Sequence, residues 1–430
     1  MKYNFKSFMK NAFLVLGFAF LVAGCSQSAA SVSEDKYSFA TPEFKAGDLY
    51  CLSTISSNVS EYDYYCFASG TEGSIVAYTS GSSDYELNSY PFTYNAGETK
   101  VNGTDWLTFV TDNNYVKAYN KNNCFKREDG KKSLSGTFSC GSDTITFSKK
   151  GKGKAVFSGH TFDITYKNDD GIVSVSDSGS SIRFYYLEDG SLLPQGALSE
   201  LTNSEKLSFH VYMNYDDKGE ALIKTIKGLP DGFYYELTQI AKTNDSNRAD
   251  LVTVQTLLTQ NPDKKFSISP GNLNNITYSH YDKKHYVSSI DEIPAEWFKG
   301  YTNLCLFKFG DNLKTKIKVG NGAFSGCTNL KEVWGSVSVN EFGENSFEGC
   351  ASLEYITFAG KPTGGTKGTT VKPNAFKDCS SSLIVRKSDV NTVQIADDAD
   401  FKVNVQDLSS ANNLGTLLTS TYIGKYWEFE

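Results

Sequence analysis

The chain has 430 residues, of which 39% are hydrophobic and 14% aromatic, and its formal net charge is −7. This length exceeds one ordinary hydrophobic core, so two or three globular domains are expected and a largely disordered chain is excluded. Residues 290–390 contain 12 Lys and Arg against 11 Asp and Glu. That balance leaves no basic face for phosphates there and argues against nucleic-acid binding.

Residues 1–24 have the features of an export signal. Lys2, Lys6 and Lys10 precede an apolar run over 12–22 that is too short for a stable membrane span. Removal of these three lysines would bring the formal charge to −7 − 3 = −10. The run ends in Leu-Val-Ala-Gly before Cys25, which resembles the lipobox of bacterial lipoproteins.

In that family the cysteine becomes the first residue after cleavage and is acylated, for example with palmitate. The resemblance therefore implies lipidation at Cys25 and anchoring to the bacterial envelope, in the outer membrane or at the cell surface. A plain secretory signal that happens to contain Cys25 is the alternative. The Ser-, Ala- and Glu-rich segment over 25–45 predicts a flexible tether.

Residues 46–195 consist of short strand-like runs, such as 73–78, 105–110 and 181–186, separated by Gly, Ser, Asn and Asp. Runs at this spacing with turn residues between them predict an antiparallel all-β domain, either a sandwich or a small barrel. A filled sandwich would space the rest of the chain from the membrane. A barrel would instead hold a lipid or another small apolar ligand.

Two groups of cysteines follow Cys25. Cys51, Cys66, Cys124 and Cys140 form two pairs of similar spacing, which predicts disulfides 51–66 and 124–140 in an exported protein, with two other connectivities open. Cys305, Cys327, Cys350 and Cys379 lack the close pairs of a metal site. We expect the last three to form a column of small, reduced, mostly buried residues and no metal to be bound.

Residues 205–289 predict alternating helices and strands. Leu222, Ile226 and Leu229 fit one helical face, as do Leu251, Val254 and Leu258. A short apolar strand follows each helix, over 233–237 and 266–268. Such an α/β segment is what the open end of a repeat array needs as an N-terminal cap.

A pattern centred on a phenylalanine recurs four times over residues 290–390. Its phenylalanines are Phe298, Phe324, Phe347 and Phe376, and each follows an apolar residue by five positions. Three of the four units read Ala/Ser-Phe-x-Gly/Asp-Cys, and the first has Tyr301 in place of the cysteine. A leucine follows each unit, at Leu304, Leu330, Leu353 and Leu383. A repeat of this period must stack on its neighbours, which predicts a solenoid with two buried columns, followed by a C-terminal cap or tail over 391–430.

These units resemble the BspA-like leucine-rich repeats of bacterial surface antigens, and the resemblance covers about residues 216–390. It implies a cell-surface protein that attaches to host matrix proteins, host cells or other bacteria and is not an enzyme. No binding residue is fixed in that family, so the resemblance leaves the ligand open. It does not account for residues 46–195.

The chemistry of the sequence agrees with a binding role. None of the four histidines lies at metal-ligand spacing, and no nucleophile motif or cofactor-binding motif occurs, so no catalytic residue, metal or cofactor is assigned. In a strand of the type L-x-x-L-x-L, the intervening side chains point to the exposed face. These positions form the predicted contact surface: Lys308, Lys331, Glu332, Trp334, Glu354, Tyr355 and Thr357.

Trp334 has two interpretations of similar weight. As a contact residue it would supply much of the binding energy. As a packing residue it would cover the gap at Gly335. The sequence as a whole predicts a membrane-anchored, adhesin-like lipoprotein that holds a protein or matrix macromolecule. A carrier of a lipid or small ligand in the β domain and a structural envelope protein are the alternatives.

Overall fold

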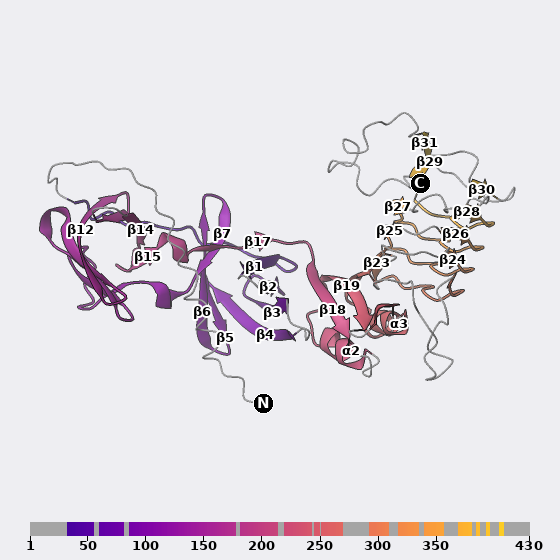
Figure 1. Cartoon of the computed structure of the whole chain (residues 1–430), viewed down its shortest axis with the longest axis horizontal. Coiled ribbons are helices and arrows are strands. Elements are labelled where there is room, and N and C mark those ends of the chain that lie inside the picture. Colours follow the sequence, from indigo (N-terminus) through magenta and orange to yellow (C-terminus); the bar gives the residue numbers. More distant parts are fainter. Residues whose placement is uncertain are drawn as a thin grey trace. The chain divides into compact units, whose positions relative to one another are not determined.

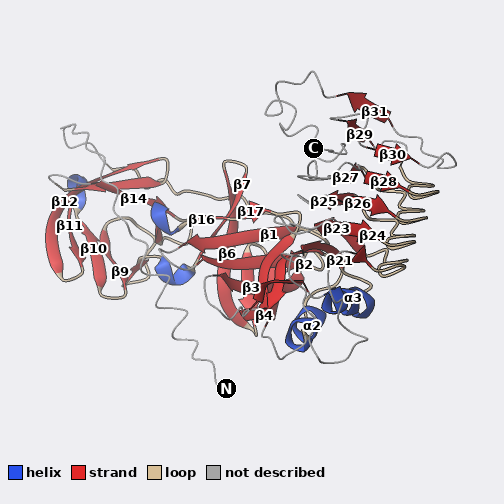
Figure 2. Ribbon diagram, turned by 45° about the vertical axis from the view of Figure 1, so that its right-hand side comes forward, coloured by secondary structure: helices blue, strands red, loops and turns tan. Residues whose placement is uncertain are grey.

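The computed structural model of the protein describes a mostly β chain with few helices (Figures 1 and 2). The described residues are 32–55, 60–80, 86–177, 181–213, 219–242, 245–249, 251–269, 292–308, 317–334, 339–356, 369–380, 384–387, 393–395 and 404–407. Two compact units are present. The first comprises residues 1–46, 67–73 and 91–202, and the second comprises 47–66, 74–90 and 203–430. The sequence pattern predicted a domain boundary near residues 195–205. It did not predict that residues 47–66 and 74–90 belong to the second unit.

The first sheet is an antiparallel meander, because its neighbouring strands are mostly neighbours in sequence, in the order β16-β7-β6-β5-β4-β3-β2-β1-β17. Tight turns with left-handed residues connect several of its strands, for example Asn102 and Gly103, with φ of 51° and 78°. The strand bounds are β1 Leu49–Ile55, β2 Ser60–Phe67, β3 Glu72–Ser80, β4 Glu86–Asn95, β5 Glu98–Val101, β6 Thr104–Asp112, β7 Tyr115–Tyr119, β16 Ser199–Glu200 and β17 Thr202–Asn203.

The second sheet is also an antiparallel meander, with β8 to β15 in sequence order. Its strands are β8 Lys126–Arg127, β9 Gly136–Cys140, β10 Asp143–Phe147, β11 Lys152–Phe157, β12 His160–Asp169, β13 Ile172–Ser176, β14 Ser181–Tyr186 and β15 Leu192–Pro194. Short 3-10 helices η1 Lys121–Asn123, η2 Lys149–Gly151 and η3 Gln195–Ala197 flank or interrupt it. Along β12, Ile164, Tyr166 and Asn168 are buried while their neighbours are exposed, which is the period of a strand with one covered face.

Residues 32–45 are held against both antiparallel sheets, which corrects the prediction of a flexible tether for these residues; residues 25–31 of that prediction lie outside the described residues. Tyr37 pairs with Leu187 and Ala40 with Thr111 as isolated β-bridges. The Asn168 Nδ2 group donates to the carbonyl oxygens of Ser33 and Asp35 at 2.9 and 2.8 Å. The Ser- and Ala-rich composition of this segment indicated a tether. Aromatic rings anchor it instead, because Phe44 stacks on Phe67 with ring centroids 4.0 Å apart.

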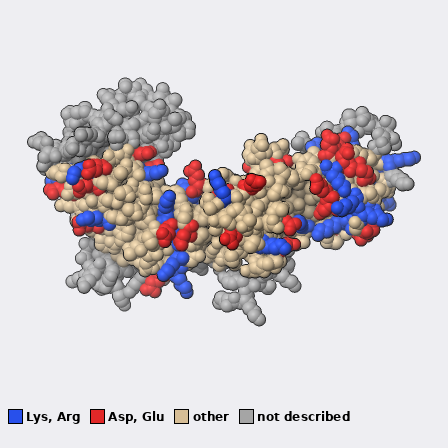
Figure 3. Space-filling view, turned by 180° about the vertical axis from the view of Figure 1, so that it is seen from behind, with Lys and Arg blue, Asp and Glu red and all other residues tan. Residues whose placement is uncertain are grey.

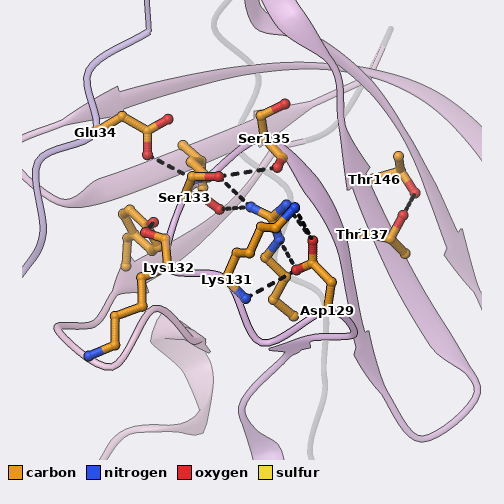
Figure 4. A network of polar contacts seen from close by, with 11 residues as sticks. Glu34, Asp129, Lys131, Lys132, Ser133, Ser135, Thr137 and Thr146 are labelled. Atoms are coloured by element: carbon orange, nitrogen blue, oxygen red, sulfur yellow. Dashed lines mark hydrogen bonds and ion pairs between the residues drawn. The ribbon is translucent and has the colours of Figure 1, made fainter.

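The same segment closes a polar loop of the second sheet. The Arg127 guanidinium is paired with Asp129, with Nη2 at 3.0 Å from Oδ2, and it also donates to Ser133 (Figure 4). The Glu34 carboxylate accepts from the Leu134 amide at 2.8 Å. These charge-assisted contacts fix the connection between β8 and β9 and leave Leu134 buried in the core.

The second unit contains a seven-stranded sheet in which β18, β19, β21, β23, β25 and β27 run parallel, while β20 pairs antiparallel to β19. Helix α2 lies between β18 and β19 in sequence, and α3 lies before β21, as the helical periodicity predicted. The bounds are β18 Leu207–Met213, α2 Glu220–Lys227, β19 Tyr234–Lys242, β20 Asp245–Ala249, α3 Leu251–Gln260, β21 Lys265–Ser269, β23 Leu304–Lys308, β25 Glu332–Trp334 and β27 Tyr355–Ile356.

A second parallel sheet accompanies the repeats, in the order β22-β24-β26-β28-β30. Its strands are β22 Glu292–Ile293, β24 Ile317–Val319, β26 Val339–Phe342, β28 Thr369–Val371 and β30 Val393–Ile395, and β29 Ile384–Lys387 pairs with β31 Asn404–Asp407. Val371 is in register with Ile395. The parallel pairing therefore continues beyond residue 390, where the sequence pattern ends.

The turns between the two parallel sheets also stack. The amide of Phe298 donates to Ala323, that of Phe324 to Ser346 and that of Phe347 to Ala375, each at 2.7 Å. Each repeat is thus bonded to the next through the strands and through the turn that contains its phenylalanine. Figure 2 shows the strands of successive repeats lying one above another.

The two predicted columns are buried, as far as they are described. Phe298, Phe324 and Phe347 have no exposed surface and Phe376 retains 6%. Their rings stack with centroids 5.0 to 5.4 Å apart. Leu304, Leu330 and Leu353 are likewise fully buried, whereas Leu383 lies outside the described residues. In the described part of the chain, no helix has the length and apolar character needed to cross a membrane.

Candidate functional site

Strands β23, β25 and β27 lie one above another (Figure 1), and their register places the predicted contact positions in three adjacent columns. Lys308 pairs with Trp334. In the next column, Leu306 pairs with Glu332 and Glu332 with Tyr355. In the third, the Lys331 amide donates to Cys305 at 2.8 Å and the Glu354 amide to Lys331 at 2.9 Å. Phe307 and Val333 alternate with the residues of the first two columns and are buried, so these two columns lie on the opposite face of the sheet. In the third column, Lys331 and Glu354 lie just before β25 and β27.

The described side chains of this surface are charged and partly accessible. Lys331 is exposed, while Glu332 and Glu354 are half-buried. Lys308, Trp334 and Tyr355 have their backbone in strands, but their side chains lie outside what the structure describes, and Thr357 lies outside the described residues altogether. The contact role of the seven residues therefore stays a prediction.

One of these columns continues onto β21, β19 and β18, which the sequence interpretation did not include. Its member on β21, Ser267, is buried. Leu306 is in register with Ser267, Ser267 with Glu236 and Glu236 with Ser208. The Glu236 carboxylate accepts from Lys206 Nζ and from Ser208 Oγ, each at 2.7 Å. We call the outer face formed by these columns on β18, β19, β21, β23, β25 and β27 the repeat face.

A sequence signal for this extension existed. Phe233, Tyr235 and Leu237 are buried and alternate with Tyr234 and Glu236, which are half-buried. Alternation of this kind predicts a strand with one open face. The prediction of a cap rested on the buried side chains of this segment and did not use the half-buried ones that alternate with them.

Two titratable groups on or beside the repeat face are held in their neutral form. Burial raises the pKa of Tyr234, and the nearby groups of Cys305, Glu236 and Glu332 raise it further. Burial also raises the pKa of Cys305, although Lys265 and Lys331 act in the opposite direction. Tyr234 is consequently a neutral phenol at physiological pH, and Cys305 a neutral thiol, so neither is an activated nucleophile.

The repeat cysteines have a structural role. The Cys327 thiol donates to the carbonyl of Phe298 at 2.9 Å, Cys350 to Phe324 at 3.1 Å and Cys379 to Phe347 at 3.2 Å. Each thiol therefore bonds to the preceding repeat. Tyr301 takes this position in the first repeat, and its hydroxyl lies 2.7 Å from Thr259 Oγ1 on α3.

Burial keeps these repeat thiols protonated. It raises the pKa of Cys327 and of Cys379 to about 12, and it raises the pKa of Cys350 as well. Because the thiolate is the metal-binding and reactive form, the column packs and donates hydrogen bonds. Among the described residues, no group of three His, Cys, Asp or Glu side chains could hold a metal ion.

The four N-terminal cysteines are free thiols in this structure. Cys51 is opposite Tyr64, and Cys66 is opposite Leu49, in the β1–β2 hairpin. The two cysteines are thus diagonal neighbours, a relation with Cα atoms ~7–8 Å apart, beyond the usual ~5.5–6 Å of a disulfide. Cys140 is near enough to Cys124 to raise its pKa, after burial as the main cause, and a 124–140 disulfide stays a prediction.

Aromatic rings pack against one another inside the first unit. Phe67, Phe92 and Phe109 are almost fully buried. The Phe67 ring lies 5.2 Å from Phe92 and 6.1 Å from Tyr94, in edge-to-face contacts. These contacts favour a filled β core over a ligand-holding barrel.

In the second unit, an open groove between α2 and α3 is lined by Glu220, Ile223, Lys224, Lys227, Thr256 and Gln260.

Comparison with known proteins places the repeats in a family. Residues 275–396 match the BspA type leucine-rich repeat region in six copies, where the phenylalanine pattern alone identified four. No curated protein and no solved structure matches the chain. Repeats of this family are in general surfaces for protein interaction and are typically not catalytic. Residues 275–396 of the chain are therefore BspA-type leucine-rich repeats.

Proposed function

We propose that this protein holds a macromolecule, a protein or a matrix component, on its repeat face. The observation that supports the proposal most is the register of the outer columns, which aligns the Lys308–Trp334 pair beside Leu306, Glu332 and Tyr355. An aromatic pair flanked by opposite charges has the composition of an interface hot spot. We interpret the stacked repeats as a solenoid and the segment with α2 and α3 as its N-terminal cap, which makes the repeat face one continuous surface.

The proposal includes export and lipid anchoring at Cys25, supported by the resemblance of residues 21–25 to a lipobox. In this scheme the protein is an adhesin-like lipoprotein of the bacterial envelope. Cys25→Ser is the direct check: labelled fatty acid should enter the parent and not the variant, whereas equal labelling of both would contradict lipidation at this residue.

The binding proposal is tested on residues 26–430, because a cut at residues 195–205 would separate 47–66 and 74–90 from the rest of the second unit. The chain would be screened against immobilised matrix proteins and host-cell surfaces. For any partner found, Trp334→Ala is expected to weaken binding by about tenfold or more, with an unchanged melting temperature, because the indole contacts the partner.

Trp297→Ala is the matched control. Trp297 is half-buried, and its indole N–H donates to the Leu251 carbonyl at 3.4 Å, so this variant should melt earlier and, once folded, bind normally. The packing interpretation predicts the same behaviour for Trp334→Ala, namely a lower melting temperature and unchanged affinity. That result would remove Trp334 from the contact surface. Binding that survives substitution throughout the repeat face would overturn the proposal itself.

A further inference from the structure

The outer face of the second sheet is rich in cations and hydroxyl groups. Lys152, Lys154, Lys167 and Arg183 are all exposed on β11, β12 and β14, and we call these four residues the lysine face. Their positions alternate along the strands with Ala155, Ile164, Tyr166 and Phe184, which are buried in the core. The four cationic side chains therefore share the side of the sheet opposite this core. At the end of β13 and β14 on that side, Ile172 and Tyr185 pack with Tyr37 and Phe39.

The strand register shows how close together these cations are. Lys152 is opposite Thr165, which is opposite Ser176, and Lys167 is opposite Ser174, which is opposite Arg183. Strands are ~4.8 Å apart, and alternate residues along one strand are ~7 Å apart. The four cations thus fall within a patch of about 15 Å by 15 Å by these spacings. Figure 3 shows Lys and Arg side chains gathered over this region, towards the right-hand end of the view.

Few acidic groups offset this charge on the same face. Asp163 is opposite Lys154, and Asp169 pairs with Lys167 at 2.7 Å, with both side chains at least 60% exposed. An ion pair that exposed is weak and can exchange partners. The remaining outward residues include hydroxyl side chains that can donate to phosphate oxygens, at Thr137, Thr146, Thr165, Ser174 and Ser176. The chain as a whole has a net charge of −7, whereas this face carries more positive than negative side chains.

The chain enters the fold at one end of the same sheet, where Val32 packs against its core side. A Cβ atom placed on Gly151 would lie 3.7 Å from Val32 Cγ2, so Val32 is next to the turn that leads into Lys152. Exposed Lys150 belongs to the same turn. Val32 is seven residue steps after Cys25, a distance of at most about 25 Å for an extended chain. A lipid on Cys25 would therefore hold this end of the sheet close to the membrane surface.

We propose that the lysine face docks on the anionic headgroups of the membrane in which the lipid is anchored. The placement rests on the lipidation proposed above, and the choice of partner rests on charge complementarity. Lysine ammonium groups attract phosphate-rich surfaces within a Debye length. One lipid attachment combined with a basic patch gives the two signals that a stable membrane association requires.

The test uses residues 26–430, which lack the lipidated cysteine, and measures co-sedimentation with vesicles. Vesicles of phosphatidylcholine containing phosphatidylglycerol should bind the protein, and binding should fall as salt increases. Pure phosphatidylcholine vesicles should bind it weakly. Lys152→Glu/Lys154→Glu should reduce the partition coefficient on anionic vesicles by about tenfold or more. Lys224→Glu/Lys227→Glu, which makes the same charge change on the exposed side of α2, should change it less than about twofold.

Three outcomes would overturn the proposal: equal binding to neutral and anionic vesicles, equal loss in the two double variants, or no vesicle binding while an acidic polysaccharide is bound. Lys167→Gln/Arg183→Gln provides a second variant should the charge reversal impair folding. Residues 26–430 lack Cys25, so the vesicle results would be the same if Cys25 were not lipidated in the full-length protein. Binding to the repeat face, measured on the same double variants, should also be unaffected.

Discussion

Phe347→Ala is expected to lower the free energy of unfolding by about 3–5 kcal/mol. The Phe347 ring has no exposed surface, and it stacks between Phe324 at 5.0 Å and Phe376 at 5.4 Å. Its removal would leave a cavity in the middle of the column, where the neighbours on both sides lose contact. Because stability in a repeat array passes between neighbours, hydrogen-exchange protection should fall in both flanking repeats.

Ser346→Ala is the control in the same repeat. Ser346 is fully buried, and its hydroxyl has no hydrogen-bond partner, so replacing it removes an unsatisfied polar group and should be neutral or slightly stabilising. Chemical denaturation of the three proteins under one set of conditions gives the comparison. A Phe347→Ala protein as stable as the parent would show that the stacked column does not hold the repeats together.

Gly320→Ala is expected to destabilise the protein by about 1–3 kcal/mol through overpacking. A Cβ atom at residue 320 would lie 2.6 Å from the amide nitrogen of Ala295 and 2.7 Å from the carbonyl oxygen of Ile293. Both are backbone atoms of the preceding repeat, and the Gly320 amide already donates to that same carbonyl at 2.8 Å. The methyl group can be accommodated only if adjacent repeats move apart.

Gly196→Ala is the matched substitution, because a Cβ atom at residue 196 would meet nothing within 4 Å. Thermal melting should show a lower midpoint for Gly320→Ala and little change for Gly196→Ala. The fourth repeat has Lys372 at the position equivalent to Gly320, so the column does not demand glycine in every repeat. Equal melting of the two variants would mean that the repeats are spaced more loosely than the backbone contacts indicate.

The repeat core could be predicted from the sequence because its signals are local and periodic. Phe298, Phe324 and Phe347 recur with a fixed preceding apolar residue, and they occupy one buried column. The extension of the parallel pairing to Ile395 was missed, because residues 393–395 carry no phenylalanine motif. Backbone pairing can continue where the side-chain pattern has ended, since the amide and carbonyl groups of any strand remain available.

The contact columns were predictable within the repeats but not beyond them. Spacing alone aligns Glu332 with Tyr355, because both follow a buried leucine by two residues. The addition of Ser267 and Glu236 depends on how β19 and β21 pair with β23. That pairing joins segments of different local pattern, and no periodicity extends across them. The docked position of residues 32–45 was missed for a related reason, because its partners are distant in sequence.

The large sequence separation between residues 32–45 and their partners affects how the first unit folds. Tyr37 donates to Asp112, 75 residues further along the chain, and Ser33 accepts from Asn168, 135 residues further. Residues 33–37 emerge early in synthesis, yet the partners that hold them emerge much later. Contacts of such high sequence separation form slowly, since a long loop must close before they stabilise anything. Residues 32–45 should therefore be the last part of the first unit to become protected during refolding, and they should stay accessible to proteases until their partners have been synthesised and folded.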